Sequence, residues 1–328
     1  MNRHKNNNLS VGVIGKDNHA LRLIKILEKS DLVEDIKIYY HRDYKGIDPR
    51  VTNDLQTLFS CNAIIIASPT PSHVEYIQKL TKFTGYILVE KPLVTNIENS
   101  KYLLNLNLEA KQRIKVNYSF IDSPVFRKIK EIVTKNRLGA PIEMAIRMGH
   151  GFAYSDKYIK NWRSTLSTNG VAEQTGVHFI NAAIHLFGGI VNGNIKSENF
   201  SGNGDVPDTS MITLDMANKA RVNIFVSYSV PYQFDLLLTC TDGLYRYDGV
   251  AEHIHEPRNY YDEDGRFISP PKTYENSISY RDNWDIGLEN SITEFLKSTI
   301  SQEPLNLESL NIALSTMEPI FENKIHTN

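Results

Sequence analysis

The sequence is poor in cysteine, nearly neutral in charge and without long hydrophobic runs. Its two cysteines, Cys61 and Cys240, lie far apart and have no Cys-x-x-Cys partner, which indicates reduced structural thiols in a cytoplasmic protein. Residues 1–8 are polar and lack the apolar core of a signal peptide, and no later run reaches the length of a membrane span. We therefore expect no membrane partner.

The charge balance makes a nucleic-acid partner unexpected. Thirty-six Lys and Arg residues stand against 38 Asp and Glu residues, and no basic stripe has aromatic residues interleaved with it. The 328 residues are enough for two domains, and no internal repeat divides them further.

Strand and helix patterns alternate over the first 120 residues. Short apolar runs occupy residues 10–14, 36–40, 62–67, 86–89 and 114–117, and helical patterns occupy residues 21–29, 71–81 and 97–108. This alternation predicts a doubly wound, Rossmann-type parallel sheet. Ligands of such sheets bind at the carboxyl ends of the strands.

The pattern changes in the second half of the chain. A helix is predicted from Pro124 to about Thr134, followed by strand-like runs at residues 142–148, 210–216, 220–229 and 233–241. Runs without intervening helices predict an α+β domain on a largely antiparallel sheet with one open face. Two helices, at residues 284–300 and 307–321, end the chain. We place the boundary near residue 120, giving a dinucleotide-binding domain at 1–120 and a substrate and oligomerisation domain at 121–328.

The turn after the first strand fits a dinucleotide-binding fingerprint in part. Gly15 takes the first glycine position and Ala20 the last, but Asp17 stands where a glycine usually lets the backbone approach a pyrophosphate. Asp17 could instead cap the following helix by accepting from its first N–H groups. Both interpretations stay open from this motif alone.

The end of the second strand bears on cofactor choice. His41 and Arg42 follow it, where an NAD site usually has Asp or Glu for the ribose diol. Arg42 could bind a 2′-phosphate with two hydrogen bonds, which favours NADP over NAD. The alternative is that Arg42 is a solvated loop cation.

An acid, a base and a proline, Glu90-Lys91-Pro92, end the fourth strand. A partly desolvated lysine at the exit of a buried strand can have its pKa lowered toward neutrality and can act as an acid or base. The alternative is a surface Glu-Lys pair.

A polar stripe marks one helical pattern in the second half. If residues 171–187 form one helix, Gln174, His178, Asn181 and His185 share a face, which then faces water or lines a cleft. No carboxylate or cysteine has metal-binding spacing to the two histidines, so no metal site is predicted. Residues 252–256 resemble metal ligands in composition but are predicted to form a solvated hairpin.

Together these features resemble the Gfo/Idh/MocA family, the relatives of glucose–fructose oxidoreductase and inositol dehydrogenase. The matching features are Gly15, the turn Ser68–His73, Glu90-Lys91-Pro92, Trp162-Arg163 and the segment Gly170–His178. The resemblance implies a Rossmann domain and a second domain whose open sheet covers the active site and forms a homodimer or homotetramer. It also implies NAD(P)-dependent oxidation or reduction of a sugar, a cyclitol or a nucleotide-linked sugar.

The resemblance also implies roles for individual residues. Lys91 would contact the reacting hydroxyl and the nicotinamide ribose, and His178 would be the general acid/base. Gln174 stands where the family often has Asp, and because an amide cannot take a proton we expect it to orient the substrate. The other expected substrate residues are Trp162, Arg163 and Asn181. The expected cofactor residues are Gly15, Lys16, Asp17, Asn18, His41, Arg42, Ser68, Pro69, Thr70, His73, Glu90, Lys91 and Asn117.

These residue types suit hydride transfer, which needs a base for the hydroxyl proton and a cation for the developing alkoxide. His178 suits the first task and Lys91 the second. The alternative is a non-catalytic relative that binds a nucleotide or sugar as a regulator or scaffold. Asp17 and Gln174 favour that alternative, whereas Lys91 and His178 favour an enzyme.

Overall fold

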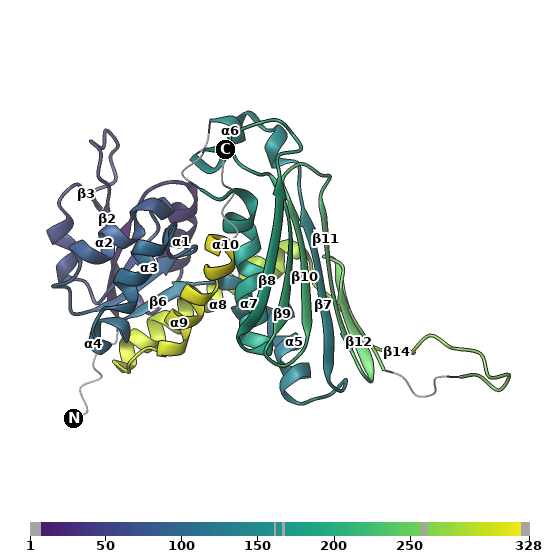
Figure 1. The fold of residues 1–328 in the computed structure, drawn as a ribbon. Helices are drawn as coiled ribbons and strands as arrows, with labels where there is room; N and C mark the ends of the chain where they lie inside the picture. Colours follow the sequence, from purple (N-terminus) through teal and green to yellow (C-terminus); the bar gives the residue numbers. More distant parts are fainter. Residues whose placement is uncertain (1–7, 161, 166–167, 257–260, 323–328) are drawn as a thin grey trace, which may run out of the picture. The chain divides into compact units, whose positions relative to one another are not determined.

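The computed structural model describes residues 8–160, 162–165, 168–256 and 261–322 (Figure 1). The chain divides into two compact units. The first contains residues 1–118 and 289–314, and the second contains residues 119–288 and 315–328. The sequence pattern does not predict that residues 289–314 belong to the first unit.

The first unit is built on a parallel sheet, as predicted. Its strands are β1 (Leu9–Ile14), β2 (Val33–Tyr39), β3 (Val51–Thr52), β4 (Ala63–Ile66), β5 (Tyr86–Glu90) and β6 (Ile114–Asn117). They lie in the order β3-β2-β1-β4-β5-β6, and all neighbours are parallel. The direction of winding reverses between β1 and β4, which makes their carboxyl ends the expected ligand crevice.

Helices connect these strands. They are α1 (Asn18–Glu28), α2 (His73–Lys79), α3 (Ile97–Leu104) and α4 (Leu108–Lys111), and α8 (Tyr280–Ser301) and α9 (Leu307–Ser315) add the returning residues. Because crossovers between parallel strands are right-handed, α1 lies on one face of the sheet and α2 and α3 on the other. The helix predicted over residues 97–108 is interrupted because Asn107 caps a new helix, accepting a hydrogen bond from Ala110 N.

The second unit is built on a largely antiparallel sheet, also as predicted. Its strands are β7 (Pro141–Gly149), β8 (Ile190–Glu198), β9 (Thr209–Met216), β10 (Arg221–Ser227), β11 (Gln233–Cys240), β12 (Gly243–Tyr247), β13 (Ala251–His255) and β14 (Lys272–Ser277). The order is β14-β13-β12-β11-β7-β10-β9-β8. β7 and β10 pair in parallel, and the other neighbours among the described strands are antiparallel.

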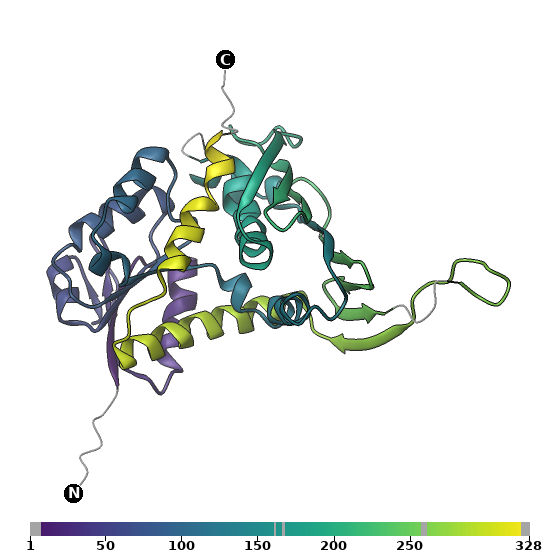
Figure 2. The ribbon, with the colours of Figure 1, turned by 60° about the horizontal axis from the view of Figure 1, so that its bottom comes forward.

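Helices of this unit cover one face of the sheet, and the described residues place none on the other face (Figure 1). They are α5 (Pro124–Thr134), α6 (Asp156–Ile159), a π-helical turn (Ala172–Gly176), α7 (Val177–Phe187), the first part of α8, and α10 (Glu318–Glu322). Between β13 and β14, residues 261–271 form a loop that projects beyond the sheet (Figure 2).

One sequence interpretation of this unit is wrong. Residues 252–256 are not a solvated hairpin, because residues 251–255 form β13 within the sheet. The Glu252 side chain is buried and accepts hydrogen bonds from the hydroxyls of Tyr245 and Tyr274, at 2.7 and 2.9 Å. A buried carboxylate held by donors inside the sheet cannot be told from a solvated one by composition.

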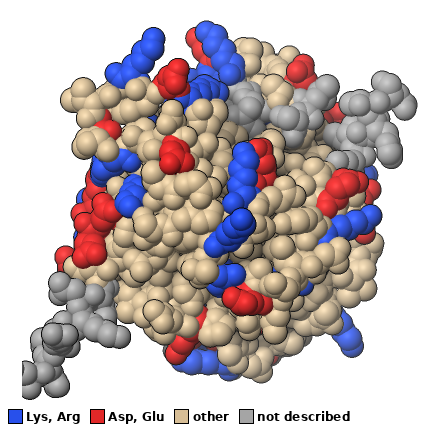
Figure 3. All heavy atoms as spheres, turned by 90° about the vertical axis from the view of Figure 1, so that its left-hand side faces the viewer, with Lys and Arg blue, Asp and Glu red and all other residues tan. Residues whose placement is uncertain are grey.

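Two further features bear on partners. Among the described residues, no helix is long and apolar enough to cross a membrane. Figure 3, which looks at the first unit, shows Lys and Arg side chains interspersed with Asp and Glu side chains.

Candidate functional site

The turn after β1 depends on a glycine. Gly15 has φ +121°, and a Cβ atom there would lie 2.9 Å from the carbonyl oxygen of Ala67, in the turn after β4. Its N–H donates to Tyr39 O at 3.1 Å, at the end of β2. Gly15 therefore brings the carboxyl ends of β1, β2 and β4 together at the reversal of the sheet.

The N-terminus of α1 follows this turn. Asp17 occupies the capping position, but within the described residues its exposed side chain makes no capping hydrogen bond. The interpretation that Asp17 caps the helix is therefore wrong. A helix that begins at Asn18 without a side-chain cap leaves its first N–H groups available, and such an end favours an anion. The backbone here fits the pyrophosphate of a dinucleotide.

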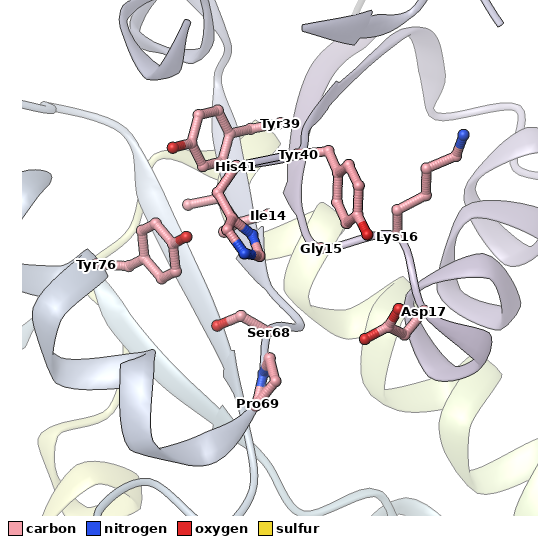
Figure 4. A pocket seen from close by; sticks show the side chains of 10 residues that line it. All are labelled: Ile14, Gly15, Lys16, Asp17, Tyr39, Tyr40, His41, Ser68, Pro69 and Tyr76. Atoms are coloured by element: carbon pink, nitrogen blue, oxygen red, sulfur yellow. The ribbon is translucent and has the colours of Figure 1, made fainter. Parts of the chain in front are cut away.

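A hollow of about 290 Å³, part of it open to solvent, lies beside this turn. Its lining consists of Ile14, Gly15, Lys16, Asp17, Tyr39, Tyr40, His41, Ser68, Pro69 and Tyr76. Figure 4 shows the His41 ring in the middle, with Tyr39 and Tyr76 on one side and Tyr40 on the other. Burial, with Tyr39 and Glu75 nearby, raises the pKa of Tyr76 to about 12, so its hydroxyl stays neutral. Aromatic walls with a few polar groups suit a planar, partly polar ligand.

Two cations flank the hollow. Arg42 is exposed and lies outside the lining, and its Nε donates to His41 Nε2 at 3.2 Å. The Lys16 Nζ lies 3.0 Å from the centre of the Tyr44 ring, a cation–π contact. Binding of a 2′-phosphate by Arg42 stays a prediction.

The turn after β4 holds four of the predicted cofactor residues. Thr70 is buried and begins a 3-10 helix, Thr70–Ser72, and the Ser72 hydroxyl donates to Ser68 Oγ at 2.8 Å. Pro69 is exposed on the rim of the hollow. His73 lies beneath the turn, 1% exposed, with Nε2 2.8 Å from Ser68 O and Nδ1 2.9 Å from Pro92 O. Burial lowers the pKa of His73, although the Ser68 carbonyl and the Glu90 charge raise it.

Glu90, at the end of β5, belongs to a hydrogen-bonded chain. Its Oε1 accepts from Asn117 Nδ2 at 2.6 Å, and Asn117 Oδ1 accepts from the Ser291 hydroxyl at 2.8 Å. The Nε2 of His19, in the first turn of α1, lies 2.9 Å from the same Glu90 oxygen. Burial alone would raise the pKa of Glu90, but the charges of His19 and Lys91 and the Asn117 amide lower it below its usual value.

Lys91 follows this chain directly. It is half-buried, and its peptide bond to Pro92 is cis. The structure thus brings the predicted residues Glu90 and Asn117 into contact beside Lys91. The sequence interpretation missed His19 and Ser291, and 174 residues separate Asn117 from Ser291.

In the second unit, the predicted helix over residues 171–187 is present, but it begins with a π-helical turn, Ala172–Gly176. Gly170 has φ +66°, and a Cβ atom there would lie 2.2 Å from Pro207 O, so the entry to the helix requires glycine. Gln174 and Asn181 are buried, so a fully solvent-facing polar stripe is wrong. A π-helical turn within an α-helix usually occurs singly, and often at a functional site.

Gln174 is tied to the preceding loop. Its Nε2 donates to Arg163 O at 2.9 Å and to Thr168 Oγ1 at 3.2 Å, and its Oε1 lies 3.4 Å from the Tyr228 hydroxyl. Asn181 donates to Thr316 Oγ1 at 3.1 Å. The side chain of Trp162 lies outside the described part, and only the 3-10 helix Trp162–Ser164 is assigned there.

His178 is half-buried, and its ring lies 4.8 Å from that of Trp284 in a T-shaped contact.

Two more aromatic residues lie near Gln174. The His150 ring stacks on Tyr228 at 5.0 Å, and the Tyr228 hydroxyl bonds with Thr175 Oγ1 at 2.8 Å. Burial lowers the pKa of His150 and raises that of Tyr228. The sequence interpretation missed Trp284, His150 and Tyr228, because none belongs to a local motif.

A loop at residues 199–207 supports this region. Asp208 is fully buried, and its carboxylate accepts from Phe200 N and Ser201 N at 3.1 and 2.8 Å. The loop in turn holds the segment before the π-helical turn, because Asp205 N donates to Ser164 O at 2.7 Å. The described residues contain no group of three or more His, Cys, Asp or Glu side chains that could hold a metal ion.

Two family models match this chain in succession. Residues 7–118 match the model described as an oxidoreductase family with an NAD-binding Rossmann fold. Residues 126–246 match the model of the GFO/IDH/MocA C-terminal domain. The chain belongs to the Gfo/Idh/MocA family. It is therefore a member of a family of NAD-binding oxidoreductases, as the sequence resemblance predicted.

Individual proteins resemble the chain at low identity. Oxidoreductase P35 of Formosa agariphila is 28% identical over 191 residues, which cover 57% of this chain and 56% of P35. Inositol 2-dehydrogenase 3 of Saccharopolyspora erythraea is 21% identical over 241 residues, 70% of this chain and 68% of that protein. The chain thus spans little more than half the length of P35.

A solved structure shows the same Gfo/Idh/MocA fold. The WlbA dehydrogenase of Chromobacterium violaceum, in complex with NADH and UDP-GlcNAcA, superposes with a TM-score of 0.76 at 15% identity. The match covers 96% of this chain and 92% of that one. At this identity the likeness concerns the fold alone.

Proposed function

We propose that the protein is an NAD(P)-dependent enzyme that transfers a hydride between nicotinamide and a hydroxyl or ketone of a sugar, a cyclitol or a nucleotide-linked sugar. The observation that carries the proposal is the end of β5, where Lys91 directly follows a buried Glu90 of lowered pKa. In a family of NAD-binding oxidoreductases, a lysine held beside a buried carboxylate at a strand end is suited to act on a reacting hydroxyl.

The residues of the first unit fit such a cofactor. The uncapped N-terminus of α1 would hold the pyrophosphate, and the hollow between Tyr39, Tyr40 and Tyr76 would hold the adenosine half. When bound, the nicotinamide supplies the acceptor or donor of the hydride.

Residues of the chain would stabilise the alkoxide charge and transfer the hydroxyl proton. Because the pKa of Glu90 is lowered, its carboxylate is anionic at neutral pH, and the neighbouring Lys91 ammonium would stabilise a developing alkoxide. His178 would take or give the hydroxyl proton. Gln174 cannot take a proton, and its amide N–H groups donate to Arg163 O and Thr168 Oγ1. This supports His178, rather than residue 174, as the acid/base.

The chemistry is tested in both directions, read as absorbance of the reduced nicotinamide: reduction of NAD+ or NADP+ with cyclitols, sugars and nucleotide-linked sugars, and oxidation of NADH or NADPH with the corresponding ketones. Lys91→Ala should lower kcat by about 100-fold or more at an unchanged melting temperature. A Lys91→Ala enzyme with wild-type turnover would refute the site. Nucleotide binding without turnover on any class would favour a non-catalytic binding protein.

We further propose that NADP is preferred over NAD, because Arg42 is an exposed cation at the end of β2. NADPH should bind more tightly than NADH, and Arg42→Ala should remove most of the difference. Lys45→Ala is the matched control, since Lys45 is an exposed cation three residues further on that is not part of the hollow's lining. Equal affinity of the wild type for both nucleotides would reject this role of Arg42.

We also propose self-association through the open face of the second sheet, as a dimer or tetramer. Met211 is 56% exposed on β9, and ion pairs such as Arg221–Asp215 lie nearby. Sedimentation of the full chain tests this, and Met211→Glu should shift it toward the monomer. Both cysteines are free and buried, which supports a cytoplasmic location.

A further inference from the structure

A fully buried histidine joins the two turns that carry the predicted cofactor and catalytic residues. His73 is 1% exposed, with Nε2 2.8 Å from Ser68 O and Nδ1 2.9 Å from Pro92 O. Ser68 lines the hollow after β4, and Pro92 is the residue after Lys91. One planar ring therefore spans the backbones of both turns.

The chemistry of these contacts leaves no ring nitrogen for a ligand. Carbonyl oxygens only accept, so each contact becomes a hydrogen bond when its ring nitrogen carries a proton. A singly protonated ring donates to one carbonyl and turns a lone pair toward the other, so the ring holds both turns only when it is doubly protonated. Burial opposes that form, whereas the two carbonyls and the Glu90 charge favour it. Because water is excluded at this depth, the contacts face little competition.

We propose that His73 is a positioning residue whose Nδ1 side fixes Lys91 through Pro92 O and whose Nε2 side fixes the cofactor turn through Ser68 O. The rigid ring sets the separation between the two carbonyls, so displacement of either turn strains the other. This inference rests on the proposed function for the roles of Lys91 and of the Ser68 turn. It assigns His73 a place behind the site rather than contact with the cofactor.

Two substitutions separate the two sides of the ring. In His73→Asn, the amide nitrogen takes the place of ring Nδ1, so the variant keeps a donor for Pro92 O. In His73→Gln, the amide nitrogen takes the place of ring Nε2, so the variant keeps a donor for Ser68 O. Each variant loses one contact, and we expect both to lose similar amounts of thermal stability.

The two variants should differ in function. His73→Gln, which releases the turn with Lys91, should lower kcat about 10- to 100-fold and leave the nucleotide Kd within about threefold. His73→Asn, which releases the Ser68 turn, should raise the nucleotide Kd about three- to tenfold and leave kcat within about threefold. Equal changes of kcat and Kd in both variants would overturn the proposal, because a purely structural histidine predicts that pattern.

A readout that needs no turnover keeps this inference separate from the proposed function. Lys91 is followed by NMR after reductive methylation of the lysines, with its signal assigned from Lys91→Arg. His73→Gln should shift the titration of Lys91, and His73→Asn should leave it near that of the wild type. If the wild type binds no nucleotide, the proposed function fails, but this test still decides whether His73 positions Lys91. An unchanged Lys91 titration in His73→Gln would refute the positioning role of His73, even if the enzyme is active.

Discussion

Replacing Gln174 with Glu tests whether this side chain is a buried donor. Its Nε2 donates to Arg163 O at 2.9 Å and to Thr168 Oγ1 at 3.2 Å, and the residue is 4% exposed. Glu has nearly the same shape, but a carboxylate offers acceptors only. In Gln174→Glu, the Arg163 carbonyl would face a carboxylate oxygen in place of an N–H group.

The expected cost follows from these contacts. An orphaned buried carbonyl and a second lost hydrogen bond together cost about 2–4 kcal/mol. For a unit of this size, that lowers the melting temperature by about 4–16 °C.

The cost should also depend on pH. Burial raises the pKa of a carboxyl group, so Glu at this position would bind its proton more tightly in the folded state than in the unfolded state. Relative to neutral pH, the variant is therefore stabilised at acid pH, and that gain is lost as the pH rises through its folded pKa.

Thermal melting of the full chain at about pH 5 and about pH 8 measures both effects. Gln174→Met, which removes the donors without adding a charge, is the matched control and should show a deficit independent of pH. A Gln174→Glu variant that melts with the wild type at both pH values would refute the assigned donor role. An equal deficit at both pH values would refute the reasoning about charge.

Three further substitutions test the supports of the two units. Gly15→Ala should lower the free energy of unfolding by about 1–3 kcal/mol, because its Cβ would lie 2.9 Å from Ala67 O at φ +121°. Gly189→Ala is the control and should change the melting temperature little, because its Cβ would have no atom within 4 Å. Equal effects of the two substitutions would contradict the assigned turn. Glu90→Gln should cost about 1–3 kcal/mol at neutral pH. Because the pKa of Glu90 is lowered from 4.5, the wild-type advantage should shrink as the pH falls below that value, and a deficit that persists in acid would contradict the charged network. Asp208→Asn should speed hydrogen exchange in residues 199–207, because one of the acceptors for Phe200 N and Ser201 N becomes a donor. Unchanged exchange in these residues would show that the loop does not depend on the Asp208 carboxylate.

Local signals in the sequence predicted the elements that they mark. Ser123-Pro124 predicted the start of α5, and the structure shows why: the Ser123 hydroxyl accepts from Phe126 N at 3.3 Å, and Pro124 needs no donor in the first turn. Continuous apolar runs predicted the inner strands of the parallel sheet, such as β4, where every residue is buried.

Features that depend on distant contacts could not be predicted in this way. The chain Glu90–Asn117–Ser291 joins residues far apart in sequence, and only the fold brings them together. The π-helical turn at Ala172–Gly176 has the same polar and apolar spacing as an α-helix to within one residue, so periodicity does not separate them. For the same reason the sequence placed Gln174 on a polar face, whereas the fold buries it.

Equilibrium titration of the full chain with NADPH and with NADH, followed by nicotinamide fluorescence, measures whether this chain binds a nicotinamide cofactor. We expect saturable binding of at least one nucleotide with a Kd between about 1 µM and 1 mM, weakened by Gly15→Ala. Absence of binding of both nucleotides at about 1 mM would contradict it.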